Sequence, residues 1–304
     1  MARRVVLVAA PDLPGLLDSW LLALRAERKS PQTLKAYGDG VRRFLAWAEA
    51  AGRPPSLDRS TLSGFVAALL DEGAQPATAV SRQLAVRRFS AWLTEEGEQA
   101  ADGLLGAKPP KIDVAVVPVL TEDQLRAMLA ACAGPDLRDR RDEAILRLMI
   151  ETAARAGEVV GLRVSDLNLR AGTAVVVRGK GGRGRTLPFG PQAGRSLDRY
   201  LRLRRAHRLA GTDALWLGDR GKEFTYYALD KTLKMRAERA GVEGFHAHVL
   251  RHTAASRWLA AGGSEGGLMA VAGWRRREML DRYTAATASD RAATESRSLG
   301  LGDL

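Results

Sequence analysis

Cysteine is nearly absent from this chain of 304 residues, which contains only Cys132. One thiol cannot form a disulfide framework, and it cannot supply a cysteine-based metal site. Cys132 follows Met128 and Leu129 in an alanine-rich pattern of helical spacing, where we expect it to be a buried, small apolar residue. A chain without disulfides suits a reducing compartment, so we expect a cytoplasmic protein.

Long hydrophobic runs are missing as well. No apolar stretch approaches the roughly 18 residues that a membrane-spanning helix needs. Arg3 and Arg4 precede a short apolar segment, as in a signal peptide, but Asp12 and Pro14 end that segment early. We therefore expect residues 1–11 to form a loosely packed tail, and we expect no membrane partner.

Acidic residues are in deficit. The chain has 35 of them against 47 lysines and arginines, which gives a net charge of +12 and a pI of about 10.4. This balance favours a polyanionic partner, with nucleic acid as the first candidate and a membrane surface as the second. The hydrophobic share of 46% is ordinary, and the length is sufficient for two domains with real cores.

The first hundred residues show only helical periodicity. Ser30-Pro31 is a helix start signal, with an N-cap followed by proline at the first helical position. Further helices are expected after Pro14, from Ser60, and from about 77 to 95. Arginines 82, 87 and 88 lie among apolar residues of the last of these helices. We predict a helical DNA-binding domain over residues 12–98, with Arg82, Arg87 and Arg88 as candidate DNA contacts.

Glycine, proline and lysine then accumulate, so residues 99–118 are predicted to be a linker, with a surface loop inside one domain as the alternative. A second domain is expected over residues 119–304, opening with a capping box at Thr121 and Gln124. The β-branched run 173–178 and the segment 185–188 flank a glycine-rich turn and predict a β-hairpin. The remainder is mostly helical, so the fold class is mainly α with a small β-sheet.

This second half contains two arginines, a lysine, a histidine and a late tyrosine, namely Arg155, Lys180, His248, Arg251 and Tyr283. A phosphodiester under attack gains negative charge on its non-bridging oxygens, and guanidinium offers a fixed fork of donors that stays charged. A lysine in a mobile turn can protonate the departing 5′-oxygen, and a histidine can relay a proton. A phenolic oxygen can attack phosphorus. The set predicts phosphodiester cleavage without a metal or another cofactor.

The order and spacing of these residues resemble those of the tyrosine recombinases, the family of phage integrases and Xer-type recombinases. His248 and Arg251 form a His-x-x-Arg box, Gly273-Trp274 follows, and Tyr283 stands nine positions after the tryptophan. The resemblance covers about residues 12–290, and the segment 263–283 looks most like integrases of actinobacteria and their phages. It implies an all-helical, SAM-like core-binding domain followed by an α+β catalytic domain.

The resemblance also implies a role for each motif residue. Arg155 and Arg251 would bind the scissile phosphate, Tyr283 would attack it, His248 would relay a proton or donate to the phosphate, and Lys180 would be the general acid. Supporting roles fall to Glu158 and His252. In the family, the acidic residue at position 158 often bonds the histidine of the second box; the alternative is a helix-start carboxylate that the helix dipole favours.

Three features depart from the common family pattern, the first of which is that Ala156-Gly157 is unusual after the first arginine. Trp274 replaces the more usual histidine, and an indole N–H can donate one hydrogen bond but cannot shuttle a proton. Ala153 replaces a glycine that commonly precedes the first arginine, which puts the local backbone geometry in doubt. Arg183 and Arg185, beside the lysine turn, are further candidate phosphate contacts.

The implied activity is site-specific recombination of double-stranded DNA through a 3′-phosphotyrosyl intermediate and a Holliday junction, with neither metal nor ATP. The implied assembly is a homotetramer on DNA that is a monomer when free, with an accessory factor for directionality. Two rivals remain. A type IB topoisomerase shares the tyrosine chemistry, and an inactive DNA-binding regulator would share the fold.

Overall fold

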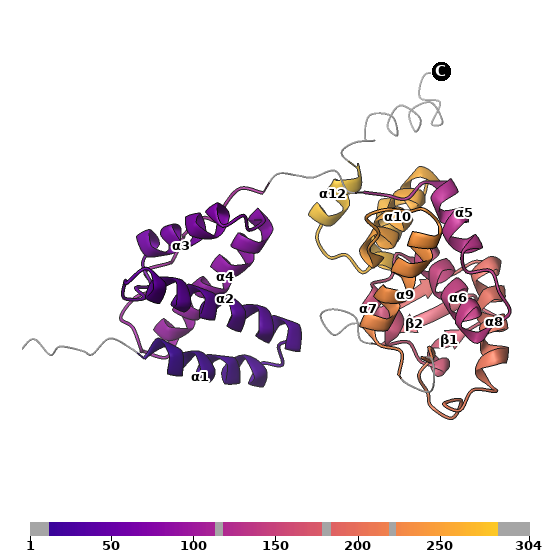
Figure 1. Ribbon diagram of the computed structural model, residues 1–304, viewed down its shortest axis with the longest axis horizontal. Helices are drawn as coiled ribbons and strands as arrows, with labels where there is room; N and C mark the ends of the chain where they lie inside the picture. The colour runs from indigo at the N-terminus through magenta and orange to yellow at the C-terminus, as the bar shows by residue number, and fades with distance from the viewer. Residues whose placement is uncertain (1–11, 113–117, 178–183, 219–222, 285–304) are drawn as a thin grey trace, which may run out of the picture. The chain divides into compact units, whose positions relative to one another are not determined.

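The computed structural model of the chain describes residues 12–112, 118–177, 184–218 and 223–284. These fall into two compact units, 1–114 and 115–304, which are treated separately below. Figure 1 shows helices throughout both units and strands in the second alone. None of the described helices is long and apolar enough to cross a membrane.

The described residues of the first unit form four helices, and most of their starts follow from the sequence. Helix α1 covers Leu13–Ala26, α2 Pro31–Ala50, α3 Arg59–Asp71 and α4 Pro76–Glu95 (Figure 1). Ser30 caps α2, as predicted, by accepting a hydrogen bond from the Thr33 amide. Helix α3 begins slightly before the predicted start at Ser60, because its cap is Asp58, whose side chain accepts a hydrogen bond from the Thr61 amide.

Aromatic side chains fill the interior of this unit. The Trp20 ring stacks on Tyr37 with 5.6 Å between centroids, and it also contacts Phe89. Phe44 and Phe65 meet edge to face at 5.4 Å in a second cluster. Such pairs contribute about 0.5–1.5 kcal/mol each beyond the area that they bury. These aromatic contacts therefore help to hold α1, α2, α3 and α4 together.

Part of the segment assigned to a linker belongs structurally to the first unit. Leu104 is buried in its core. The Ser90 hydroxyl donates to Asp102 at 2.6 Å, and Gln83 Nε2 donates to the Lys108 carbonyl at 3.0 Å. Residues 99–108 therefore pack against α4, so this stretch is ordered although it is rich in glycine and proline.

The second unit surrounds the long helix α6 (Leu137–Thr152) with shorter elements. These are α5 (Glu122–Ala130), α7 (Ala156–Val160), η1 (Val164–Asp166), α8 (Pro191–Arg204), α9 (Tyr226–Arg239), α10 (Ala247–Ala260), α11 (Glu265–Ala272) and α12 (Glu278–Thr284) (Figure 1). The capping box predicted at Thr121 and Gln124 is present at the start of α5. Cys132 is buried next to α5, and burial raises the pKa of its thiol to about 12, so the thiol is unreactive.

A small antiparallel sheet lies beside these helices, with strand order β1 (Leu167–Asn168), β2 (Thr173–Val176) and β3 (Arg185–Pro188). Its register pairs Val175 with Thr186 and Val176 with Arg185. Strands β2 and β3 form the predicted hairpin, and the register delivers the Arg185 side chain to the helical side of the domain. The mainly α fold with a small sheet is confirmed.

A buried ionic network holds the helices of the second unit together. Asp142 of α6 accepts hydrogen bonds from Arg141 at 2.8 Å and from Arg236 of α9 at 2.7 Å. Burial is the largest influence on the Asp142 carboxyl and raises its pKa, against the lowering effect of both arginines. Removing one partner from such a network leaves a buried charge unpaired, which costs about 3–5 kcal/mol.

Candidate active site

The first arginine box lies where α6 ends and α7 begins. Ala153 terminates α6 in the left-handed conformation, with φ of 49°, and this turns the chain sharply before Arg155. Arg155 is the N-cap of α7, and its backbone N–H donates to the Glu158 carboxylate at 2.8 Å. The Arg155 side chain is 28% exposed and donates to the same carboxylate at 2.9 Å. The turn thus presents one partly exposed guanidinium group.

The second arginine lies on α10 and is almost completely buried. Arg251 is 2% exposed, and its two terminal nitrogens donate to the carbonyls of Ala153 at 2.6 Å and Ala272 at 2.8 Å. Burial, reinforced by the charge of Arg155, lowers the pKa of Arg251 to about 10. The guanidinium group therefore stays charged at neutral pH, and the ends of α6 and α11 fix its position.

Trp274 packs on this arginine, and Tyr283 stacks on Trp274. Gly273 ends α11 with φ of 65°, a left-handed turn that brings Trp274 back over the helix end. The Arg251 guanidinium carbon lies 5.3 Å from the Trp274 ring, and Tyr283 of α12 stacks on the same indole at 5.2 Å and 18°. Trp274 is 6% exposed, and none of the described residues provides a hydrogen-bond acceptor for its Nε1. A buried N–H donor between a cation and a phenol suits an anionic oxygen.

The histidines of the second box lie on the same face of α10 as Arg251. His248 and His252 meet edge to face with 4.5 Å between centroids. His252 Nδ1 contacts the Tyr283 hydroxyl, which brings an imidazole to the oxygen of the candidate nucleophile. Burial first, and then the positive charge of Arg251, lowers the pKa of His248. A neutral His248 can accept a proton.

Glu158 has other partners than the resemblance implies. Its carboxylate does not bond His248 in the described hydrogen bonds; it accepts from Arg155, as above, and from both terminal nitrogens of Arg185, at 2.7 and 2.6 Å. Burial opposes ionisation, but the hydrogen bonds from Arg185 and Arg155 prevail and lower the pKa of Glu158 to about 2. Glu158 also lies in the first turn of α7, which agrees with the alternative of a carboxylate at a helix start.

Arg185 differs from the prediction of a DNA contact. Its side chain is 11% exposed, and its Nε donates to the Val271 carbonyl at 2.7 Å. All of its nitrogens thus bind groups of the protein interior. The prediction is wrong because the register of the β-strand decides which way the Arg185 side chain points. The sequence around position 185 does not reveal that Glu158 is its partner.

The remaining candidates lie elsewhere. Lys180 and Arg183 fall outside the described residues. Arg82, Arg87 and Arg88 lie on α4 of the first unit, where Arg88 is exposed and the other two are half-buried. The sequence did not single out Val271 or Ala272, because they act through backbone carbonyls, which every residue type has. Ala153 does stand out in the sequence, since it replaces a common glycine, and its backbone has the left-handed conformation that glycine favours.

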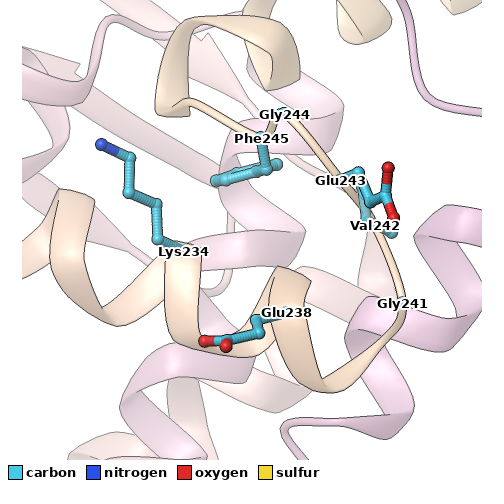
Figure 2. Close-up of a pocket in the computed structure, with 7 residues that line it drawn as sticks. All are labelled: Lys234, Glu238, Gly241, Val242, Glu243, Gly244 and Phe245. Atoms are coloured by element: carbon cyan, nitrogen blue, oxygen red, sulfur yellow. The ribbon is translucent and has the colours of Figure 1, made fainter.

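Two pockets of the second unit contain none of these motif residues. One of about 520 Å³ lies at the end of α9, between Lys234, Glu238 and the loop 241–245 (Figure 2). A groove of about 1420 Å³ runs between α6 and α9 and includes Arg138, Tyr227 and Lys231. The described residues contain no cluster of three or more His, Cys, Asp or Glu that could hold a metal ion.

Solved structures share this fold. The chain matches a XerH site-specific recombinase bound to palindromic difH substrate with a TM-score of 0.72 and 18% identity, over 91% of this chain and 83% of the other. It matches a lambda integrase (75–356) dimer bound to a COC′ core site with a TM-score of 0.68 and 16% identity, over 89% and 94%. At these identities the likeness establishes the tyrosine-recombinase fold.

Sequence comparison then establishes the family. Residues 118–290 match the profile of the "Phage integrase family", and residues 17–97 match "Phage integrase, N-terminal SAM-like domain". Tyrosine recombinase XerC of Pseudomonas savastanoi pv. phaseolicola is 35% identical over 247 residues, covering 80% of this chain and 82% of the relative. XerC of Pseudomonas aeruginosa LESB58 is 35% identical over 255 residues, covering 81% and 82%. The chain belongs to the phage integrase family of tyrosine recombinases.

Proposed function

We propose that this enzyme carries out site-specific recombination of double-stranded DNA by cutting and rejoining strands through a 3′-phosphotyrosyl intermediate. The observation that carries the proposal is the stack of Arg251, Trp274 and Tyr283. It places a buried cation, a phenol, and a buried N–H donor that finds no acceptor among the described residues side by side. A phosphate oxygen would be a suitable acceptor for the Trp274 N–H.

Charge stabilisation is the main contribution of the two arginines. Arg251 is fixed by two carbonyls and Arg155 is partly exposed, so the pair combines a rigid donor with an accessible one. As phosphorus becomes pentacoordinate, negative charge builds up on its non-bridging oxygens, and these donors favour that state over the ground state. Trp274 would add one hydrogen bond without exchanging a proton.

Proton transfer would involve the histidines and Lys180. The Tyr283 oxygen forms a bond to phosphorus and loses its proton, and His252 contacts that hydroxyl. His248 lies beside His252 and can exchange protons with bound DNA or solvent. Lys180 would protonate the departing 5′-oxygen. The phosphotyrosyl link preserves the energy of the broken bond, so religation to another strand needs no ATP.

The proposed assembly on DNA is supported by the matched structures. Among the matched structures are a lambda integrase dimer on a core site and a lambda integrase tetramer bound to a Holliday junction. We infer that four protomers of this chain act on two DNA sites, that the free protein is a monomer, and that an accessory factor sets directionality. Both units would contact DNA, and Arg88 is the exposed candidate among the three α4 arginines.

A nicked suicide substrate tests the proposal, because the strand end diffuses away after cleavage and leaves the enzyme attached. Wild-type protein should form a covalent complex that survives denaturation, in excess EDTA as well as without it. Tyr283→Phe should bind DNA with unchanged affinity and form no adduct, since only the attacking oxygen is removed. Tyr227→Phe, which changes a tyrosine that is 73% exposed on α9, is the matched control and should form the adduct normally.

Four results would contradict the proposal. An adduct formed by Tyr283→Phe would show that another residue is the nucleophile. Cleavage that stops in EDTA and returns with magnesium would show that the mechanism requires a metal. Relaxation of supercoiled DNA of any sequence would favour the type IB topoisomerase, and binding without an adduct in the wild type would favour the inactive regulator.

A further inference from the structure

Arg185 connects three segments of the active site that are far apart in the sequence. It is the first residue of β3 and stands five positions after Lys180 in the sequence. Its Nη1 and Nη2 donate to Glu158 of α7, and its Nε donates to the Val271 carbonyl in the last turn of α11. Val271 is followed by Ala272, whose carbonyl holds Arg251. One side chain therefore joins the hairpin to both arginine boxes.

Glu158 has two competing partners in this arrangement. Its Oε1 accepts from Arg155 at 2.9 Å and from Arg185 at 2.7 Å, while Oε2 accepts from Arg185 at 2.6 Å and from the Arg155 backbone at 2.8 Å. Arg185 thus makes a two-point contact with the carboxylate, and the Arg155 side chain makes a one-point contact. The Arg155 guanidinium retains donors that Glu158 does not engage.

The charges of these three side chains also favour an Arg155 that is available to an anion. The Glu158 side chain is 6% exposed, so solvent screens its negative charge poorly, and Arg185 is nearly as buried at 11%. The carboxylate and Arg185 cancel, which leaves the positive charge of Arg155 for an anion. Without Arg185, the carboxylate would cancel Arg155 instead, and a bidentate pair with Glu158 would become the favoured arrangement of that arginine.

We propose that Arg185 is a positioning residue that occupies and neutralises Glu158, so that Arg155 stays available to the scissile phosphate. It also supports the end of α11 from which Trp274 follows. Gly273 fits this role, because a Cβ at that position would lie 3.0 Å from Arg185 Nη1 in a backbone with φ of 65°. The role deepens the proposed function and rests on it.

A double-mutant cycle tests the proposal on the nicked suicide substrate. Arg185→Gln should lower the rate of covalent-complex formation on the order of 100-fold, as expected when a reacting group is misplaced. Its DNA affinity should stay within about 2-fold of wild type, since a buried arginine makes no phosphate contact of its own. The control Arg195→Gln removes the same charge from an exposed site on α8 and should cleave at the wild-type rate.

The second arm separates positioning from folding. Glu158→Gln combined with Arg185→Gln removes the carboxylate that would capture Arg155, so the double variant should regain at least about 10-fold of the lost rate. A role confined to stability does not predict this rescue.

The outcomes are distinct. Wild-type cleavage with an unaffected Arg185→Gln would overturn the positioning role and leave the proposed function intact. A slow Arg185→Gln that Glu158→Gln fails to rescue, at matched folded fractions by circular dichroism, would overturn it as well. A wild-type protein that forms no covalent complex would refute the proposed function, and the positioning role would be refuted with it.

Discussion

Ala153 is a single residue whose backbone sets the geometry of two catalytic candidates. Its φ of 49° is a conformation that favours glycine, yet the position holds alanine. The strained turn ends α6 ahead of Arg155, and the Ala153 carbonyl accepts a hydrogen bond from Arg251. The departure from the family's common glycine is therefore tolerated, because alanine pays only a modest steric penalty in this region.

A β-branched side chain at this position should not be tolerated. Ala153→Val should destabilise the protein by about 2–3 kcal/mol, since valine is a true outlier at positive φ. It should also slow cleavage by displacing the carbonyl that orients Arg251. Ala153→Gly is the control and should stay within about 1 kcal/mol of wild type, because relief of strain offsets the lost methyl group and the added chain entropy. Urea unfolding measures both; equal stability of the two variants would contradict the argument.

His248 should make stability depend on pH in the mildly acidic range. Its native pKa is lowered by burial and by the charge of Arg251, so the unfolded chain binds a proton more readily than the native protein does. Stability is therefore highest above the ordinary histidine pKa of 6.5 and falls as the pH drops below that value. His248→Gln should reduce this slope in chemical unfolding curves measured between pH 7.5 and about 5. An unchanged slope would show that other groups cause it.

Among the elements, α2 and α4 of the first unit are in unusually close contact. A Cβ at Gly40 would lie 2.6 Å from the Ala85 Cβ, so these helices approach each other where neither side chain is large. Gly38, half a turn away, differs because a Cβ there would meet only the flexible end of Arg42. The two glycines lie in one helix but face different surroundings.

This difference predicts opposite effects of one substitution. Gly38→Ala should stabilise by up to about 1 kcal/mol through helix propensity. Gly40→Ala should be less stable than Gly38→Ala by about 1–3 kcal/mol, because rigid helices must move apart. Thermal unfolding of the two variants makes the comparison, and Ala85→Gly combined with Gly40→Ala should recover part of the loss. Two variants of equal stability would mean that the helices adjust freely.

Helix starts, the hairpin and the motif order could be predicted from local sequence because each has a local cause. Ser30 and Thr121 cap helices through atoms three residues away, and apolar spacing marks the buried faces. The partners of Arg185 and Glu158 could not be predicted, since they depend on the strand register and on where α11 ends. The packing of residues 99–108 could not be predicted either, because it depends on contacts with distant residues. Leu104 is a single apolar residue in a segment whose glycine and proline content suggests an irregular linker.

At the scale of the whole molecule, the chain consists of two units, each with its own hydrophobic core. The described part of the proposed chemistry lies in the second unit, on α7, α10, α11 and α12. The first unit matches the SAM-like domain of the integrases and holds Arg82, Arg87 and Arg88 on α4. A net charge of +12 over both units suits the proposal that each contributes to DNA binding.

Salt dependence can measure how the two units share the DNA. Each phosphate contact releases counterions and adds about 0.9 to the slope of log affinity against log salt concentration. A protein of residues 118–304 should therefore show a shallower slope than the full chain, together with weaker selection of its site. Arg88→Gln in the full chain should reduce the slope by about 0.9 if it contacts one phosphate, whereas Arg195→Gln on α8 should leave it unchanged. If residues 118–304 alone gave the slope and site preference of the full chain, the second unit would make all of the DNA contacts, and the first unit would have to serve assembly instead.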